Sequence, residues 1–564
     1  MGDATTATAY VTTSIPYVNG RSHVGHALED VQADLFARYR RQRGLRTRLQ
    51  TGSDDNSLKN VLAAEGEGLP VATLVERNAR GFRELADALD VRYDGFIRTS
   101  VDAAHRMGVT ALWQACAAGA IDKRHYRGLY CVGCEQFYTP DELTPDGLCI
   151  EHLTRPDVVE EENYFFRLSR YASELRRLIT TGELRIAPES RRNEALSFIE
   201  RGLEDFSISR SATRAHGWGI SVPDDPTQVM YVWFDALGNY ITALGYGTAD
   251  VRPYESFWAT SQERLHVIGK GIMRFHAIYW PAMLLAAGLP LPSTVFVHGY
   301  LTVEGRKISK SLGNAADPRD LVARYGADAV RWYLLREVAP AADADFSVAR
   351  LIARYNTDLA DDLGNLLNRA NSMLHRYRGG VVPAPPTDPA AWPDAAALAA
   401  IAAALPDHIA GALDIFDPRV ALDAVWALVV GANRLVDSAK PWALHKSEKA
   451  GGTEAGEALD AVLYALLEAV RVVAVHLEPF VPAAAARILA QLNTPDTAAP
   501  LRRARPLGWS PCRDADGPAL SAVPKAGIVG AFQGDLIPHS TRRGDVIDFQ
   551  GGLEVAQVHS FTLT

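Results

Sequence analysis

The sequence predicts a doubly wound α/β domain of Rossmann type, interrupted by an insertion and followed by an all-α helical bundle. Two observations predict this fold class. Near the N-terminus a strand, a loop, a helix and a second strand follow one another, which is the order of a parallel sheet with ligands at its carboxyl ends. Residues 351–498 are rich in alanine and leucine with helical periodicity, which is typical of a bundle.

The first elements follow from local patterns. Residues 9–13 (AYVTT) are expected to form a buried strand, and apolar residues recur at helical spacing from Gly25 to Tyr39. Residues 48–52 (RLQTG) predict a second strand that enters the loop SDDNS. After an insertion rich in cysteine, glycine and turn residues, strand-like segments return at VMYVWFDAL, RLHVIGK and TVFVHGYLTV.

Bulk composition indicates a cytoplasmic globular protein. The 564 residues predict three to four domains, and 48% are hydrophobic and 22% charged. No uninterrupted apolar run is long enough to span a bilayer, and MGDATTATAY lacks the features of a secretory signal. Five cysteines in so long a chain do not form a disulfide framework. The net charge of −9 leaves nucleic acid open as a partner, because a local basic face can bind phosphates.

The segment His23-Val24-Gly25-His26 lies at the start of the first predicted helix. Unpaired backbone N–H groups and the helix dipole favour anions there, and Gly25 lets a ligand approach the backbone. Two imidazoles at this point can donate hydrogen bonds to phosphate oxygens. Taken alone, such a pair is more often structural.

A second segment, Lys307-Ile308-Ser309-Lys310-Ser311, precedes Leu-Gly-Asn in a glycine- and serine-flanked loop. Two lysines in such a loop suit a clamp on a polyphosphate leaving group. The alternative for this segment alone is a solvated basic loop.

The cysteine cluster has the spacing of a zinc knuckle. Cys131 and Cys134 form one C-x2-C pair, and Cys149 and His152 form a C-x2-H pair after fourteen intervening residues. Four such ligands suit a tetrahedral, structural Zn²⁺ with no open position for a catalytic water. The alternative is a set of surface thiols without metal.

The order of the two histidines, a long insertion and the two lysines resembles the class I aminoacyl-tRNA synthetases. Four further segments resemble the methionyl-tRNA synthetases of that class, and the resemblance covers about residues 8–495. These segments are PYVNG, YVWFDALGNY, HVIGKGIMRFHAIYWPAML and VFVHGYLTVEGRKISKSLGN.

The resemblance implies ATP-dependent activation of methionine, or a related amino acid, as an aminoacyl adenylate. Transfer to the 3′ end of tRNA(Met) follows, with Mg²⁺ beside ATP and a structural Zn²⁺. His23, His26, Lys307 and Lys310 are the implied catalytic residues, acting by positioning and electrostatics. One alternative is a relative that passes the amino acid to a non-tRNA acceptor in a specialised pathway. Another is a tRNA-binding protein without catalysis, which the intact histidine and lysine motifs disfavour.

The resemblance also implies binding residues. For ATP they are His23, Gly25, His26, Gly269, His298, Lys307, Ser309 and Lys310. For the amino acid they are Ile15, Tyr17, Asp54, Trp233, Ala236, Leu237, Tyr240, Ile272 and His276, with Asp54 facing the α-ammonium. For the tRNA anticodon they are Asn365, Arg369 and Trp442. Apolar and aromatic walls suit a polarizable thioether, and an aromatic face beside Asn and Arg suits unstacked bases.

The chain departs from the family at two places. The loop TGSDDNS stands where the family has TG-T-D-E-H-G, so Asp55, Asn56 and Ser57 replace glutamate, histidine and glycine. In GKGI, Gly271 stands where the family has aspartate. The resemblance places both departures near the substrate amino group and ATP. Loss of a carboxylate there should weaken amine recognition or leave room for a different substrate.

The resemblance implies six regions and a monomer, since the tail is too short for the tRNA-binding appendage of some relatives. The regions are 1–117, first half of the catalytic domain; 118–215, connective insertion with the zinc knuckle; 216–290, second half; 291–350, KISKS loop and stem-contact region; 351–498, anticodon-binding bundle; and 499–564, a tail of unassigned role.

Overall fold

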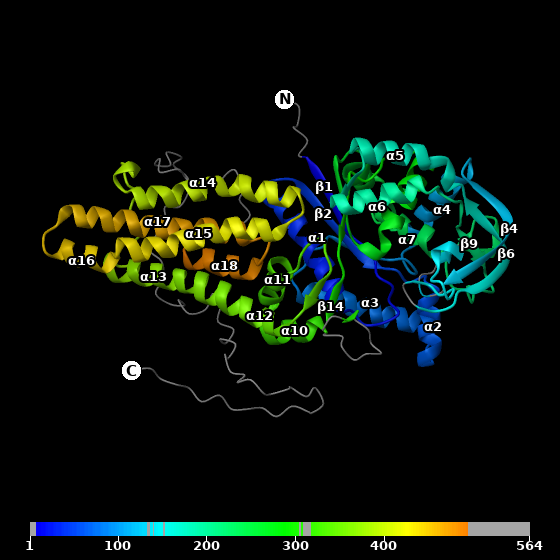
Figure 1. The fold of residues 1–564 in the computed structure, drawn as a ribbon, viewed down its shortest axis with the longest axis horizontal. Coiled ribbons are helices and arrows are strands. Elements are labelled where there is room, and N and C mark those ends of the chain that lie inside the picture. Colours follow the sequence, from blue (N-terminus) through cyan, green and yellow to red (C-terminus); the bar gives the residue numbers. More distant parts are fainter. Residues whose placement is uncertain are drawn as a thin grey trace.

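The protein combines an α/β region with a helical bundle, and both are visible in the computed structural model (Figure 1). Residues 7–493 are described, except 132, 134–135, 139, 151–152, 304–305 and 308–316. The bundle lies on the left of Figure 1, and the α/β region lies on the right. The predicted fold class is confirmed by this architecture.

A six-stranded parallel sheet forms the centre of the α/β region. Its order is β3-β2-β1-β12-β13-β7. The strands are β1 (Thr8–Thr13), β2 (Arg46–Ser53), β3 (Gly95–Arg98), β7 (Arg185–Ala187), β12 (Glu263–Gly269) and β13 (Thr294–His298). Strand β1 pairs with β2 on one side and with β12 on the other. The strand order therefore reverses beside β1, which is where open α/β sheets bind ligands.

Helices accompany the strands of this sheet. They are α1 (Val24–Gln42), α2 (Leu58–Glu67), α3 (Val71–Ala88), α4 (Ala103–Ala117), α7 (Val232–Thr242), α8 (Arg252–Tyr254) and α9 (Trp280–Ala286). All of these helices except the three-residue α8 contain buried residues. The predicted first strand and first helix are confirmed as β1 and α1. In α1, Leu28, Val31 and Leu35 are all buried.

One predicted strand is in large part a helix. Strand β11 ends at Met230, and the rest of VMYVWFDAL belongs to α7. Every residue of α7 is buried. A segment that is apolar on all sides carries no periodicity to separate a buried helix from a buried strand. The strands expected at RLHVIGK and TVFVHGYLTV are present as β12 and β13, the latter followed by β14 (Leu301–Val303).

The segment between α4 and α7 builds mostly antiparallel sheets at the right of Figure 1. The strands are β4 (Ile121–Cys131), β5 (Gln136–Tyr138), β6 (Asp157–Phe166), β8 (Phe206–Ser207), β9 (Ser209–Ser211), β10 (Ser221–Val222) and β11 (Asp225–Met230). Helices α5 (Ala172–Thr181) and α6 (Glu189–Glu200) accompany them. Strand β7 also comes from this segment, but it pairs in parallel with β13 and completes the main sheet.

The C-terminal helices form an elongated bundle. Two short strands and three helical segments lead into it: β15 (Arg306–Lys307), β16 (Ala344–Phe346), α10 (Pro318–Tyr325), α11 (Ala327–Arg336) and α12 (Val348–Arg354). The bundle helices are α13 (Asn365–Arg378), α14 (Pro393–Asp414), α15 (Pro418–Ala439), α16 (Pro441–Lys449), α17 (Thr453–Leu477) and α18 (Pro482–Gln491). Within the described ranges, α14 alone is long and apolar enough to cross a membrane by length and composition. Its buried face packs on α15 and α17, and a core helix passes the same test.

A buried ion cluster joins the bundle to the α/β region. Asp34 of α1 has no exposed surface, and its Oδ2 lies 2.8 Å from Arg38 Nε and 2.7 Å from Arg331 Nη1. Arg331 of α11 also donates to the carbonyls of Pro479 and Phe480, which follow α17. One carboxylate therefore fixes α1, α11 and the end of α17 together.

We expect Asp34→Asn to lower the free energy of unfolding by about 3 kcal/mol, because it leaves a guanidinium buried without its counter-charge. Urea titration followed by tryptophan fluorescence measures this loss. The matched control is Glu67→Gln, which removes an exposed ion pair to Arg77 and should change stability little. Equal effects of the two substitutions would contradict this account of the cluster.

Candidate functional site

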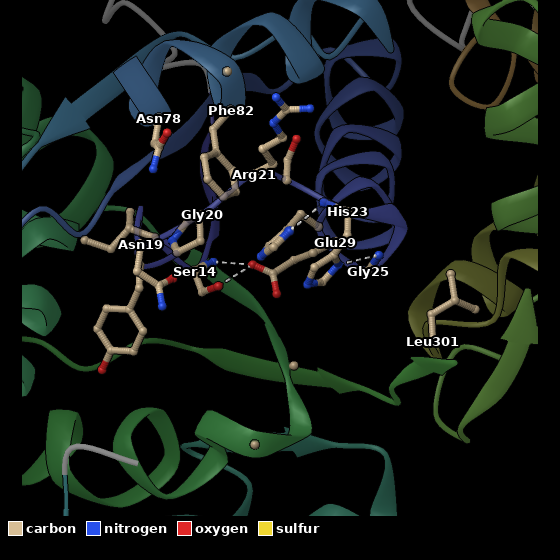
Figure 2. A pocket seen from close by; sticks show the side chains of 18 of the residues that line it. Ser14, Asn19, Gly20, Arg21, His23, Gly25, Glu29, Asn78, Phe82 and Leu301 are labelled. Carbon is tan, nitrogen blue, oxygen red and sulfur yellow. Dashed lines mark hydrogen bonds between the residues drawn. The ribbon is translucent and has the colours of Figure 1, made fainter. Parts of the chain in front are cut away.

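A cavity of about 1720 Å³ opens at the carboxyl ends of β1, β12 and β13. Figure 2 shows the part of its wall that the start of α1 and the loop before it provide. Among the residues predicted for ATP or amino acid, nine line it: Ile15, Tyr17, His23, Gly25, His26, Trp233, Gly269, Ile272 and His298. The structure thus brings together positions from four separate stretches of the chain.

The two histidines cap the start of α1. His23 is the N-cap residue, and its Nδ1 accepts the Gly25 N–H at 3.1 Å. The Nδ1 atom of His26 accepts the His23 N–H at 3.1 Å, which completes a capping box. Because each Nδ1 is an acceptor, the proton of each neutral ring resides on Nε2. The structural and the functional interpretations of this motif are therefore compatible.

Gly25 is required by the fold of the cap itself. A Cβ atom at this position would lie 2.9 Å from Cε1 and 3.0 Å from Nδ1 of His23. The ring of His23 folds back over the helix start, and its centroid lies 3.8 Å from that of His26. A side chain at position 25 would separate the His23 ring from the N–H that it accepts.

Glu29 is a site residue that the sequence interpretation missed. Its Oε1 accepts the N–H and the hydroxyl of Ser14 at 2.7 and 2.5 Å, and its Oε2 lies 3.0 Å from His298 Nε2 (Figure 2 shows the Ser14 bonds). Glu29 thereby ties α1 to the ends of β1 and β13. The signal was available, since Glu29 lies three residues after His26 on the same helix face.

Tyr17 and Trp233 form an aromatic part of the cavity wall. Trp233 stacks on Phe275 with centroids 3.7 Å apart, and Tyr17 meets Trp233 edge-on at 6.1 Å. Within the described part of the chain, the buried indole N–H of Trp233 has no hydrogen-bond acceptor. Tyr17 and Trp233 therefore give the cavity an aromatic wall, and the Trp233 N–H is buried within it.

Five predicted amino-acid residues are buried but do not line the cavity: Asp54, Ala236, Leu237, Tyr240 and His276. The hydroxyl of Tyr240 lies 2.7 Å from His276 Nε2, and His276 Nδ1 lies 2.9 Å from the carbonyl oxygen of Ile272. Burial lowers the pKa of His276 to about 4, so its ring is neutral near pH 7. His276 then donates through Nδ1 and accepts the Tyr240 hydroxyl, which fixes the direction of that hydroxyl.

Asn56 makes a specific hydrogen bond in the loop SDDNS, whose sequence differs from that of the family. Its Nδ2 donates to Asp235 Oδ2 at 2.6 Å, and Asp235 Oδ1 lies 2.5 Å from His105 Nε2. Asn56 follows β2, Asp235 lies on α7 and His105 lies on α4, so this chain of contacts joins three elements. The amide therefore supplies a donor to Asp235 at the position where the family has a histidine.

Ser57 and Asp55 also have local roles. Ser57 is the N-cap of α2 with φ −70°, and its hydroxyl accepts the Lys59 N–H at 3.0 Å, so glycine is not needed there. Asp55 is fully buried, pairs with Arg98 at 3.0 Å and accepts the Ser100 hydroxyl at 2.6 Å. Burial nevertheless raises the pKa of Asp55. Its side chain is thus engaged with the end of β3 and with the residues that follow it.

The predicted lysine loop lies in large part outside the described residues. Lys307 belongs to β15, where it pairs with Thr302 of β14. Ser309 and Lys310 lie outside the described ranges. The backbone thus carries Lys307 next to β14, whose Leu301 and Thr302 line the cavity.

Two of the four predicted zinc ligands are described. Cys131 ends β4 and Cys149 lies in the loop before β6, and both are buried. Cys134 and His152 fall outside the described residues. In the part of the chain that the structure describes, no group of three or more His, Cys, Asp or Glu side chains could hold a metal. The two buried thiols, one at the end of β4 and one in the loop before β6, nevertheless provide the soft donors that Zn²⁺ prefers.

The predicted anticodon residues lie in the bundle. Arg369 of α13 pairs with Asp437 of α15 at 2.9 Å, and Asn365 on the same helix is exposed. Trp442 of α16 is 49% exposed, although large apolar side chains are usually buried. Helix α16 lies at the end of the bundle far from the main sheet (Figure 1).

The fold and the cavity together define a class of protein. A cavity at the reversal point of a doubly wound sheet, with a histidine-capped helix start beside it, is the arrangement of a nucleotide-binding enzyme. The family described as "tRNA synthetases class I (M)" matches residues 9–152 and 138–371. The "Anticodon binding domain of methionyl tRNA ligase" matches residues 386–509.

Similar proteins agree with these matches. The methionine–tRNA ligase of Mycobacterium leprae is 42% identical over 487 residues, covering 85% of this chain and 88% of that protein. The enzyme of the same name from Caldanaerobacter subterraneus subsp. tengcongensis is also 42% identical, covering 86% and 74%. Mycobacterium tuberculosis methionyl-tRNA synthetase in complex with methionyl-adenylate has a TM-score of 0.85 at 38% identity, covering 93% of this chain and 99% of that one. The chain belongs to the methionyl-tRNA synthetases of class I.

The buried His276 should make stability depend on pH. Since an unfolded histidine titrates near about 6.5 and His276 in the folded chain at about 4, the unfolded chain binds more protons between these values. The stabilisation from neutral His276 is therefore full above the unfolded pKa and is lost as pH falls, by about 2 kcal/mol at pH 5.

We expect the stability gap between the wild type and His276→Gln to shrink by that amount between pH 7 and pH 5 in urea titrations. Tyr240→Phe is the control, because it removes the hydrogen bond and keeps the imidazole. Parallel pH curves for the wild type and His276→Gln would rule out this role of the ring.

Proposed function

We propose that this chain activates methionine with ATP as methionyl adenylate and transfers the methionyl group to the 3′ end of tRNA(Met). The observation that carries the proposal is the capped histidine pair at the start of α1, which lines the same cavity as Tyr17 and Trp233. Membership of the methionyl-tRNA synthetases and the similarity to an adenylate complex support it.

The first step is a displacement at phosphorus. A carboxylate oxygen of the amino acid attacks the α-phosphorus of ATP, an O–P bond forms, the bond to the bridging oxygen breaks, and pyrophosphate leaves with its electron pair. The carboxylate is already ionised, so no general base is needed. Catalysis then depends on positioning and on hydrogen-bond donors at the developing charge.

We assign those donors to His23 and His26, whose Nε2 protons follow from the capping geometry. Lys307 and Lys310 would hold the departing pyrophosphate, and Gly25, Gly269, His298 and Ser309 complete the proposed ATP site. Mg²⁺ would enter with the ATP phosphates, and it needs no dedicated protein cage because it keeps several waters.

For the methionine side chain we propose Ile15, Tyr17, Trp233 and Ile272 as direct walls, since all four line the cavity. The remaining predicted residues, Ala236, Leu237, Tyr240 and His276, would form the layer behind these walls. Polarizable sulfur favours ring edges, and the Tyr17–Trp233 pair offers one. Asp54 would face the ammonium group from the loop after β2.

For tRNA we propose that Asn365, Arg369 and Trp442 contact the anticodon. Half-exposure of Trp442 suits base stacking, and Arg369 is held at the α13 surface by Asp437. The match to an anticodon-binding domain disfavours the alternative of a non-tRNA acceptor. We further propose the six-region division given above, a monomeric state and a cytoplasmic location.

The proposal is tested by ATP–pyrophosphate exchange with purified protein across the amino acids. Methionine should support exchange, because the histidine pair and the apolar residues Ile15, Tyr17, Trp233 and Ile272 line one cavity. Exchange with another amino acid and none with methionine would reassign the substrate. No exchange with any amino acid would favour a binding protein without catalysis.

We expect His26→Gln to lower kcat for this exchange by about a hundredfold, because one donor at the phosphate is lost. Glutamine at the third helical position still accepts the N-cap N–H, so the capping box and the thermal midpoint should be kept. Thermal melts measured together with exchange kinetics separate a loss of catalysis from a loss of stability. Retained kcat would place His26 outside the reaction.

We propose that Cys131, Cys134, Cys149 and His152 hold one structural Zn²⁺. The purified chain should contain about one zinc ion per molecule by elemental mass spectrometry, as four protein ligands close one tetrahedral site. Cys131→Ser should lose most of it, whereas Cys116→Ser, at a buried thiol outside the knuckle, should not. A zinc-free wild-type chain would refute the site.

A further inference from the structure

Gly271 is closely packed against Tyr300 at the edge of the cavity. A Cβ atom on Gly271 would lie 2.0 Å from the Tyr300 hydroxyl oxygen and 3.2 Å from its Cζ. Gly271 follows β12 in a short 3-10 turn at Lys270–Ile272, and Tyr300 follows β13. The space beside Gly271, where the family carries a carboxylate, is therefore filled by a phenol from the turn after β13.

The ring of Tyr300 is held in this place by its neighbours. The Lys270 ammonium lies 4.5 Å from the ring centroid and 2.7 Å from Asp343 Oδ2. The other carboxylate oxygen of Asp343 accepts the Tyr300 N–H at 2.9 Å. Because Lys270 holds the ring and Asp343 the backbone, the hydroxyl is directed at Gly271.

Gly271, Tyr300 and Asp343 all line the cavity that contains the histidine pair. A phenol hydroxyl can accept a hydrogen bond from an N–H or O–H group without carrying charge. A bound aminoacyl adenylate has two such groups near its centre, the amino group and the ribose hydroxyls. The cavity edge thus retains an acceptor although it has lost the carboxylate.

We propose that Tyr300 and Gly271 form one specificity-determining pair, in which the Tyr300 hydroxyl receives a hydrogen bond from the amino group or a ribose hydroxyl of the adenylate. The inference rests on the proposed function and names a contact within that site. It also predicts that a side chain at position 271 is tolerated only when the Tyr300 hydroxyl is removed.

The test compares Tyr300→Phe, Gly271→Ala and the double variant in ATP–pyrophosphate exchange, with KM for methionine and for ATP measured separately. Tyr300→Phe should raise one of these two KM values by about fivefold, which corresponds to one lost hydrogen bond. A rise in KM for methionine identifies the amino group, and a rise in KM for ATP identifies the ribose. Tyr93→Phe is the matched control, since it loses a hydroxyl bonded to Asp87 outside the cavity.

Gly271→Ala alone should raise the same KM. The KM of the double variant should be no higher than that of Tyr300→Phe, because the hydroxyl oxygen that would lie 2.0 Å from the new Cβ atom is then absent. Unchanged KM values in Tyr300→Phe, or additive losses in the double variant, would overturn the pair. If the wild type gave no exchange at all, the proposed function would fail instead. Calorimetric titration with ATP and with methionine would then still test Tyr300. The affinity for one of these two ligands should fall in Tyr300→Phe, and both affinities should be unchanged in Tyr93→Phe.

Discussion

Parallel pairing of β1 with β2 on one side and β12 on the other is the constraint on which the site depends. It brings the carboxyl ends of β2, β1, β12 and β13 to one edge of the sheet. Four parts of the site lie at that edge: the loop with Asp54, the start of α1, the turn with Gly271, and His298 at the end of β13. Residues far apart in sequence therefore meet around one cavity, and Glu29 links two of these strand ends directly.

Local patterns were enough to predict much of this arrangement. Strand β1, helix α1 and the bundle follow from hydrophobic periodicity, and the histidine motif marks the helix start. The start of α7 was missed, because a segment buried on every side has no amphipathic signal. Strand β7 was missed because its three residues gain their partner only from β13, a contact that no local pattern encodes.

The departures from the family show why substitutions must be considered together with their spatial neighbours. Asn56 supplies a donor to Asp235, and Ser57 is an ordinary N-cap, so both changes are satisfied within their own surroundings. Gly271 differs, because its compensation comes from Tyr300 in the turn between β13 and β14. The loss of a carboxylate was visible in the sequence, whereas the hydroxyl that occupies its place was not.

The proposed chemistry lies in the α/β region and the proposed tRNA selection lies in the bundle, and the ion cluster at Asp34 fixes the two regions together. Charging of tRNA(Met) transcript with radiolabelled methionine, using the purified chain and ATP, tests both assignments in one assay. We expect methionyl-tRNA with the normal transcript and little with one whose anticodon is scrambled. Adenylate formation without transfer to either transcript would contradict the proposed function.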